Sequence, residues 1–153
     1  MTNVRLAIPT DVAQLVRILQ RSPEAGSWSE NDLRQSLVEG SRRHCLVAES
    51  EGLVVGFLLA ACPVEEETEI LTLAVEPAAR RCGVARALVE TFLRSRRGEV
   101  FLEVRRSNLA SQELYLATGF AVAGVRAGYY DSPREDALVM KWKRPLPNSS
   151  TLC

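Results

Sequence analysis

Three arginines, Arg80, Arg81 and Arg86, surround a glycine at which a predicted helix begins. The sequence has no carboxylate between Glu76 and Glu90 that could neutralise them. Free N–H groups at the start of a helix, together with the helix dipole, favour the binding of anions. An anionic ligand would therefore explain the arginines, but a solvated basic loop would have the same composition. The segment lacks the GK[ST] ending of a Walker loop and the three glycines of a dinucleotide-binding turn.

Apolar residues at helical spacing predict four helices that would position this loop and its neighbours. The helices are expected to begin after Thr10, at the capping-box-like Ser29, at Gly83 and at Asn108. The second helix is short and ends near Gly40, and Gly119 suits the left-handed position that ends the fourth.

Short apolar and β-branched runs between turn residues predict about seven strands. They cover residues 5–8, 44–49, 53–61, 69–75, 100–104, 120–125 and 137–142. A helix separates the fourth strand from the fifth, so these two are expected to be parallel neighbours. The order β-α-α-β-β-β-α-β-α-β-β predicts a mixed α/β fold in one domain over residues 1–143. A disordered tail is expected over residues 144–153.

Composition and charge exclude several classes of protein. The chain has 46% apolar and 25% charged residues, which is typical of one globular domain. Nineteen basic and nineteen acidic side chains give no net charge, so we expect neither nucleic acid nor a membrane as partner. The apolar stretches are short and the N-terminus does not resemble a secretory signal, which predicts a cytoplasmic location. The four cysteines are far apart and His44 is the only histidine, so no metal is expected.

The arginine-rich loop resembles the signature of a known family. Its sequence, Arg80-Arg81-Cys82-Gly83-Val84-Ala85, is similar to the [RQ]-x-x-G-x-[GA] pyrophosphate loop of GNAT acetyltransferases, and the resemblance extends over roughly residues 4–143. It implies a central mixed sheet of about seven strands with four helices, whose two central parallel strands splay to admit acetyl-CoA. The cofactor contacts that it implies around the loop are Leu73, Ala74, Val75, Arg81, Cys82, Gly83, Val84, Ala85 and Arg86.

Three further segments resemble one group within that family, the bacterial ribosomal-protein alanine N-acetyltransferases. They are Trp28-Ser29-Glu30, residues 102–108 with Leu114-Tyr115 and Gly119-Phe120, and Tyr129-Tyr130 with residues 134–137. The resemblance implies Glu103 as proton acceptor, Tyr115 as proton donor and Asn108 as a cofactor contact. Aminolysis of a thioester needs a neutral amine and a proton for the departing thiolate, and a carboxylate and a phenol suit these two tasks. Without the resemblance, Glu103 would be interpreted as a strand-end charge and Tyr115 as a core aromatic.

Glu69 is a second candidate for the general base. Residues 69–75 also resemble the strand that carries the base of histone-type GNAT enzymes. Both Glu69 and Glu103 are single carboxylates that would lie near the mouth of a cleft, and we favour Glu103. The acidic run over residues 65–69 is also typical of a solvated turn.

The acceptor is expected to bind against aromatic walls with acids at the rim. The resemblance places Tyr129 and Tyr130 over the first residues of a peptide, and Trp28 and Glu69 complete the predicted acceptor site. The chain is thus expected to transfer acetyl from acetyl-CoA directly to the N-terminal α-amine of a protein, with a ribosomal protein as a candidate. The alternatives are an acetyltransferase for a lysine side chain or a small free amine, and a non-catalytic acyl-CoA-binding protein.

Overall fold

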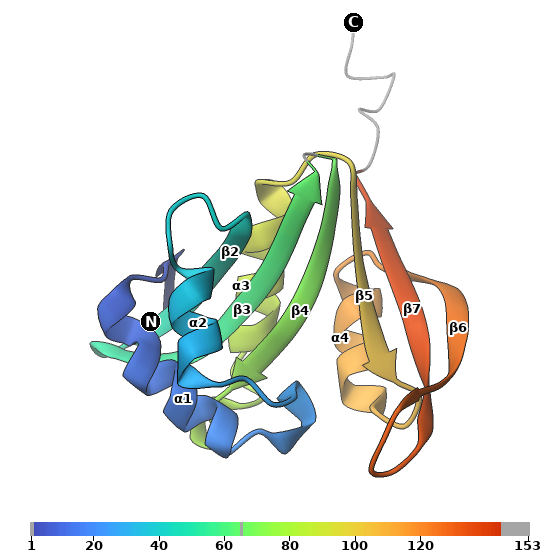
Figure 1. Ribbon diagram of the computed structural model, residues 1–153, viewed down its shortest axis with the longest axis horizontal. Coiled ribbons are helices and arrows are strands. Elements are labelled where there is room, and N and C mark those ends of the chain that lie inside the picture. Colours follow the sequence, from blue (N-terminus) through green and yellow to red (C-terminus); the bar gives the residue numbers. More distant parts are fainter. Residues whose placement is uncertain (1, 65, 145–153) are drawn as a thin grey trace, which may run out of the picture.

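Seven strands form one mixed sheet in the computed structural model, which describes residues 2–64 and 66–144 (Figure 1). The strands are β1 (Thr2–Leu6), β2 (Arg43–Ser50), β3 (Leu53–Val64), β4 (Glu67–Val75), β5 (Glu99–Arg105), β6 (Ala121–Tyr130) and β7 (Glu135–Lys143). Their order in the sheet is β1-β2-β3-β4-β5-β7-β6. All neighbours are antiparallel except β4 and β5, which are parallel as the intervening helix predicted.

Four α-helices cover the sheet, and the predicted order of elements is confirmed. They are α1 (Val12–Gln20), α2 (Glu30–Ser36), α3 (Val84–Arg94) and α4 (Leu109–Ala117). The helices α1 and α2 lie on one face of the sheet over β2–β4, whereas α3 and α4 lie on the opposite face, with α4 behind β5 (Figure 1). The predicted capping box is present, because Ser29 Oγ accepts from the Asp32 amide at 3.0 Å and the Asp32 carboxylate accepts from the Ser29 amide at 2.9 Å.

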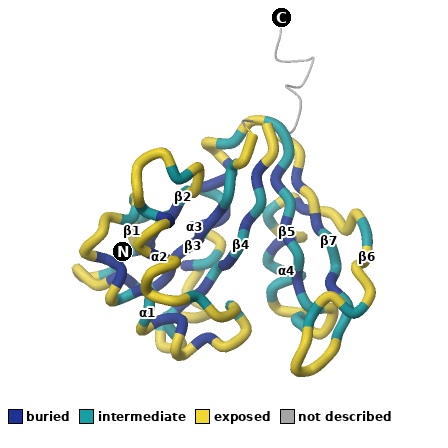
Figure 2. Tube along the Cα trace, in the orientation of Figure 1, coloured by how far each residue is buried: buried dark blue, intermediate teal, exposed yellow. Residues whose placement is uncertain are grey.

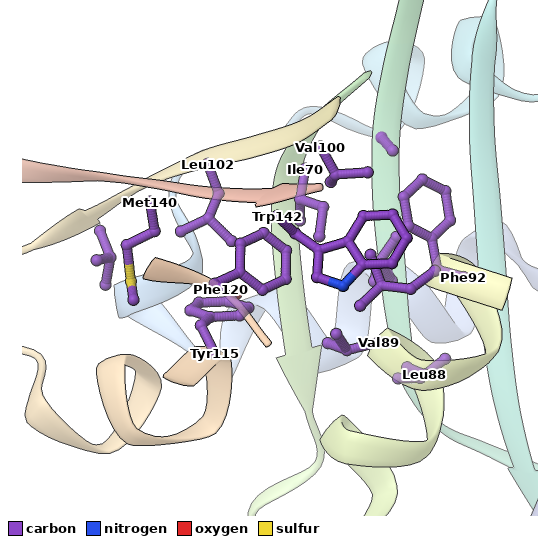
Figure 3. Close-up of a cluster of buried hydrophobic side chains, with 14 of the residues drawn as sticks. Ile70, Leu88, Val89, Phe92, Val100, Leu102, Tyr115, Phe120, Met140 and Trp142 are labelled. Atoms are coloured by element: carbon purple, nitrogen blue, oxygen red, sulfur yellow. The ribbon is translucent and has the colours of Figure 1, made fainter. Parts of the chain in front are cut away.

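Two hydrophobic cores hold the helices to the sheet. Under α1 and α2, side chains such as Leu15 and Phe57 are completely buried. On the other face, Phe92 of α3 and Tyr115 of α4 belong to one continuous cluster with Trp142 of β7 (Figure 3). The second core therefore spans the boundary between β4 and β5, although the two strands separate there.

The splay of the two central strands follows from a β-bulge in β4. The strands β4 and β5 pair only from Glu67 to Glu69 on the β4 side. Immediately afterwards, the register between β3 and β4 changes from the pair Ala60–Ile70 to the pair Leu59–Thr72, so Leu71 is an extra residue. A bulge bends its strand and increases its twist. The end of β4 therefore turns away from β5, as the widening gap in Figure 1 shows.

The structure corrects several predicted boundaries. The first strand is Thr2–Leu6 rather than 5–8, because its pairing with β2 ends at Leu6. The helix α2 ends at Ser36 rather than near Gly40. The strand β6 continues to Tyr130 instead of ending at 125, and it is exposed along most of its length (Figure 2). The predicted tail, apart from residue 144, lies outside the described residues.

Candidate active site

A cleft of about 360 Å³ lies where β4 and β5 diverge. Its lining comes from β4, β5, the end of β6, the helix α4 with its N-cap, and the segment 24–28 that precedes α2. Eight predicted site residues line it: Trp28, Glu69, Leu73, Glu103, Asn108, Tyr115, Tyr129 and Tyr130. Because the lining includes residues from both faces of the sheet, the cleft opens through the sheet at the splay.

Glu103 presents an unpaired carboxylate oxygen in this cleft. Only 9% of its side chain is exposed, and its Oε1 lies 3.2 Å from Nη1 of Arg126. The other oxygen, Oε2, is buried and has no hydrogen-bond partner among the described residues. Buried polar atoms without partners are rare and call for an explanation. A proton acceptor that awaits a donor from outside the chain provides one.

Glu69 lies on the same face of the sheet as Glu103. The register pairs Glu69 with Phe101, and Glu103 follows Phe101 by two residues, which returns its side chain to that face. Burial and the negative charge of Glu103 raise the pKa of Glu69, whereas Arg126 acts in the opposite direction. Two carboxylates therefore lie close together in the cleft, with Arg126 near both, and they would attract an incoming ammonium group.

Tyr115 approaches the cleft from α4, on the face of the sheet that carries α3 and α4. It is 6% exposed and packs edge-to-face on Phe120, with ring centroids 5.4 Å apart. Burial, with a smaller contribution from Tyr130, raises the pKa of Tyr115 well above its usual value. The phenol consequently keeps its proton at physiological pH. Its hydroxyl makes no hydrogen bond with another described residue, so it can donate to a ligand in the cleft.

Asn108 caps α4 and also lines the cleft. Its side-chain oxygen accepts from the Ser111 amide at 3.2 Å, as expected for an N-cap residue. Asn108 therefore directly precedes the helix that carries Tyr115. The splay brings both to one cleft, where the Asn108 side-chain NH₂ group remains available to a ligand.

The hairpin between β6 and β7 carries the aromatic wall of the cleft. The rings of Tyr129 and Tyr130 pack edge-to-face with centroids 5.0 Å apart. The neighbouring Glu103 carboxylate, together with partial burial, raises the pKa of Tyr129 to about 12. The Arg105 guanidinium lies 4.4 Å from the centroid of the Tyr130 ring, a cation–π distance. Both tyrosines are thus held against residues of β5.

The acids beside these tyrosines have internal roles. Glu135 pairs with Arg105 at 3.2 Å and accepts from the Ser107 amide at 2.6 Å. Asp136 accepts from the Gly128 amide at 2.9 Å and lies 3.5 Å from Arg106. Glu135 and Asp136 therefore fasten the hairpin to β5 and to the residues that follow it.

The predicted anion loop follows the end of β4 and leads into α3. Arg81 and Gly83 both have positive φ, 65° and 79°, and the helix makes its first hydrogen bond from the Ala87 amide to the Gly83 carbonyl. Among the described residues, no acceptor lies at the main-chain amides of residues 81–86. These amides are free to bind an anion at the positive end of the helix dipole.

Two of the three arginines near this loop form ion pairs with carboxylates of the same chain. Arg80 pairs with Glu24 at 2.9 Å, and Arg86 pairs with Glu90, one helical turn later, at 2.6 Å. Within residues 2–64 and 66–144, Arg81 makes no ion pair. The loop therefore offers one unpaired cation and a set of amides, rather than three unpaired cations.

The other residues predicted to bind the cofactor are partly packed in the two cores and partly exposed. Ala74 packs into the α1 core, and the side chain of Val84 packs into the α3 core. The Val75 carbonyl accepts from Arg80 Nε at 3.1 Å. Cys82 is exposed, and its thiol donates to the Arg80 carbonyl at 3.6 Å. The side chains of Ala74 and Val84 are thus unavailable to a ligand, and these residues could contact one only through the main chain.

The unpaired edge of β4 and the free amides of α3 suit one kind of molecule. Beyond Glu69, β4 no longer pairs with β5, which leaves main-chain groups on that edge for an extended ligand. A polyanion with an extended, amide-bearing arm, such as acetyl-CoA, matches this combination. In the described part of the chain, no group of three or more His, Cys, Asp or Glu residues could hold a metal ion. No helix there is long and apolar enough to cross a membrane.

Arg126 is the functional candidate that sequence reasoning missed. It extends from β6 across β7 to Glu103, and its guanidinium lies 5.4 Å from the centroid of the Tyr129 ring. One signal was present in the sequence, because Arg126 is the only charged residue in the strand Ala121–Tyr130.

Comparisons with known proteins agree with this geometry. The acetyltransferase (GNAT) family matches residues 12–120. The chain is 34% identical over 146 residues to the [ribosomal protein bS18]-alanine N-acetyltransferase of Escherichia coli K12, which covers 92% of this chain and 96% of that protein. A crystal structure of the ribosomal-protein-S18-alanine N-acetyltransferase from Escherichia coli matches with a TM-score of 0.84 and 29% identity over 97% of each chain. Ard1 from Thermoplasma volcanium matches with a TM-score of 0.80 and 28% identity over 92% of this chain and 95% of that one.

Proposed function

Because the chain belongs to the GNAT family of acetyltransferases, we propose that it transfers the acetyl group of acetyl-CoA to the N-terminal α-amine of a protein. The observation that carries this proposal is the cleft through the sheet, with a buried carboxylate, Glu103, and a buried phenol, Tyr115, in its lining. These are the two proton-transfer groups that direct attack of an amine on a thioester requires.

Glu103 and Tyr115 have complementary roles in this proposal. Acetyl-CoA supplies the acetyl thioester when it is bound. Glu103 removes a proton from the acceptor amine through its unpaired Oε2, directly or through water, while the new N–C bond forms. Tyr115 donates its hydroxyl hydrogen to the sulfur as the C–S bond breaks. The raised pKa of Tyr115 ensures that this hydrogen is present throughout the physiological range.

The residues that would hold acetyl-CoA lie at the start of α3 and along β4. The amides of residues 81–86 would bind the pyrophosphate, with Arg81 as an additional positive charge. The free edge of β4 beside Leu73 would pair with the extended arm, and the side-chain NH₂ group of Asn108 would contact it from α4. These contacts use mainly main-chain groups, so they fix the position of the co-substrate without a metal.

The acceptor side of the cleft supports an α-amine. Its ammonium form is attracted by Glu69 and Glu103, and the rings of Trp28, Tyr129 and Tyr130 enclose the residues that follow. An α-amine has a pKa of about 8 against about 10.4 for lysine, so more of it is neutral at physiological pH. The relatives named for alanine of ribosomal protein bS18 support a ribosomal acceptor beginning with alanine, which would place the enzyme in the cytoplasm.

Glu69 supports a second candidate function, acetylation of a lysine side chain. It lines the same cleft, and burial and the charge of Glu103 raise its pKa toward the range useful to a general base. In that case Glu69 would act as the base and Glu103 would orient the acceptor.

An acceptor panel tests the proposal. Acetyl-CoA is supplied with a peptide beginning with alanine, the same peptide with a blocked N-terminus and an internal lysine, a polyamine, or no acceptor, and thiol release is measured. We expect the unblocked peptide to be the best acceptor. Equal turnover of the polyamine would favour a small-amine enzyme, and no release with any amine would indicate a non-catalytic acyl-CoA-binding protein.

A further inference from the structure

Arg80, the first residue of the signature loop, forms a three-way link inside the chain. Its Nε donates to the Val75 carbonyl at 3.1 Å, at the end of β4. Its Nη2 donates to Ser22 Oγ at 3.1 Å and to Glu24 Oε1 at 2.9 Å. The guanidinium therefore joins the loop before α3 to the segment that follows α1, rather than remaining free for an anion.

The segment joined by Arg80 is one wall of the acceptor side. Ser22 is completely buried, and the residues that follow it, 24–28, line the cleft and end at Trp28. Two further links hold this segment in place. Thr72 Oγ1 donates to the Ala25 carbonyl at 2.8 Å, and Arg21 pairs with Glu76, the residue after β4. The wall is thus fastened to the strand and the loop that would hold acetyl-CoA.

We propose that Arg80 is a positioning residue that holds the acceptor wall, residues 22–28, to the co-substrate loop, so that acetyl-CoA binding and acceptor binding are coupled. The inference rests on the proposed function, because it takes the loop as the acetyl-CoA side and residues 24–28 as the acceptor side. Arg80 directly precedes Arg81, whose main-chain amide is the first of the free amides. A change in the loop around a bound anion is therefore transmitted to the Arg80 guanidinium. Two sites that bias one linked element affect each other's affinity reciprocally.

A kinetic comparison separates this role from ordinary anion binding. Arg80→Gln keeps a polar side chain but loses the fork that reaches both Ser22 and Glu24. We expect the KM for the acceptor to rise about tenfold while the acetyl-CoA affinity changes by less than about threefold. Ser22→Ala should have the same direction of effect, and because Ser22 is completely buried it cannot touch the acceptor itself. Arg17→Gln on the exposed side of α1 is the matched control and should equal the parent.

The effects of Arg80→Gln and Ser22→Ala on the acceptor KM should also be non-additive. If Arg80 acts through Ser22, then Ser22→Ala in the Arg80→Gln background should add little, since the link is already broken. Arg80→Lys keeps the charge but not the fork, and should restore only part of the parent's acceptor KM. An unchanged acceptor KM in Arg80→Gln together with weakened acetyl-CoA binding would overturn the proposal, because Arg80 would then be an anion-binding residue.

Amide hydrogen exchange tests the coupling without any acceptor. Acetyl-CoA should slow exchange in residues 81–86 and also in residues 22–28 of the parent and of Arg17→Gln. In Arg80→Gln the slowing should remain in 81–86 and disappear from 22–28. Equal slowing of 22–28 in Arg80→Gln would overturn the coupling and leave the proposed function intact. Coupling without turnover of any amine would overturn only the proposed function, and no effect of acetyl-CoA on either segment of the parent would overturn both.

Discussion

On the α3 side of the cleft, the groups offered to a ligand are main-chain amides, whereas on the β6 side they are charged and aromatic side chains. The amides of residues 81–86 are held by local backbone geometry, including positive φ at Arg81 and Gly83. The opposite side depends on Glu103, Arg126 and Tyr129, which come from two strands and act on one another. A main-chain site tolerates side-chain replacement, but a charge network does not. Substitutions on the acceptor side should therefore have the larger effects.

Glu103→Gln should cause the largest loss of activity. The amide keeps the shape of the side chain but cannot accept the amine proton, and general acid–base groups contribute about 10²- to 10⁴-fold. The loss in kcat/KM should become smaller as pH rises, because the α-amine then deprotonates without help. Steady-state rates from pH 6 to pH 9 with an alanine-first peptide measure this effect.

Glu69→Gln is the matched control for that prediction, since it removes the neighbouring carboxylate from the same face. We expect a loss of less than about tenfold, arising from weaker attraction of the ammonium group. An inactive Glu69→Gln beside a nearly active Glu103→Gln would transfer the role of base to Glu69 and favour the lysine-acetylating alternative.

Tyr115→Phe should lower turnover without weakening the binding of acetyl-CoA. The substitution keeps the packing on Phe120 and removes only the hydroxyl, so kcat should fall by about 10²-fold while the acetyl-CoA affinity remains close to that of the parent. Rapid-quench turnover and equilibrium binding separate the two quantities. A loss of affinity equal to the loss of rate would mean that Tyr115 is a binding residue.

Arg126→Gln should shift the acid side of the pH profile. Arg126 opposes the factors that raise the pKa of Glu69, so without it that carboxylate takes up a proton at a higher pH than in the parent. Activity should therefore fall below the parent's at low pH, by roughly threefold to tenfold, and recover as pH rises. Arg106→Gln is the control, because Arg106 pairs with Asp136 rather than with Glu103, and an identical profile for the two variants would contradict this role.

Arg81→Gln and Arg86→Gln should have the smallest effects, because backbone amides supply most of the anion site. Arg81 makes no ion pair within the described residues, so its loss should weaken acetyl-CoA binding by about threefold at low salt and less at high salt. Arg86 is already paired with Glu90 and should contribute less. Equilibrium binding at two salt concentrations tests both variants, and unchanged affinity of the Arg81 variant at low salt would mean that Arg81 does not contribute to the pyrophosphate site.

How much of the fold could be predicted from the sequence depends on whether a feature is set by local signals. The element order, the Ser29 capping box, the Asn108 cap and the parallel pair β4–β5 depend on local signals or short connections, and they were predicted correctly. The bulge at Leu71 was missed, because the residues from 70 to 75 are almost all apolar and show no alternation of residue type that an extra residue could interrupt. The length of β6 was missed because its exposed residues follow no hydrophobic period.

The assembly of the site depended on contacts that no local pattern encodes. The pair Arg80–Glu24 joins residues 56 positions apart, and the pair Arg126–Glu103 crosses the intervening strand β7. The roles of Glu103 and Tyr115 came from family resemblance, and they remain predictions. The structure adds that both line one cleft, with an unpaired carboxylate oxygen and a buried phenol.

Mapping the acetylated atom within a single peptide tests the central claim most directly. The peptide begins with a free alanine amine and contains a lysine several residues later, so the two acceptors compete at equal concentration. After a short incubation with acetyl-CoA and the parent enzyme, fragmentation mass spectrometry locates the acetyl group. The account predicts acetylation on the α-amine and its loss in Glu103→Gln at neutral pH. Acetylation on the lysine, retained in Glu103→Gln and lost in Glu69→Gln, would contradict it.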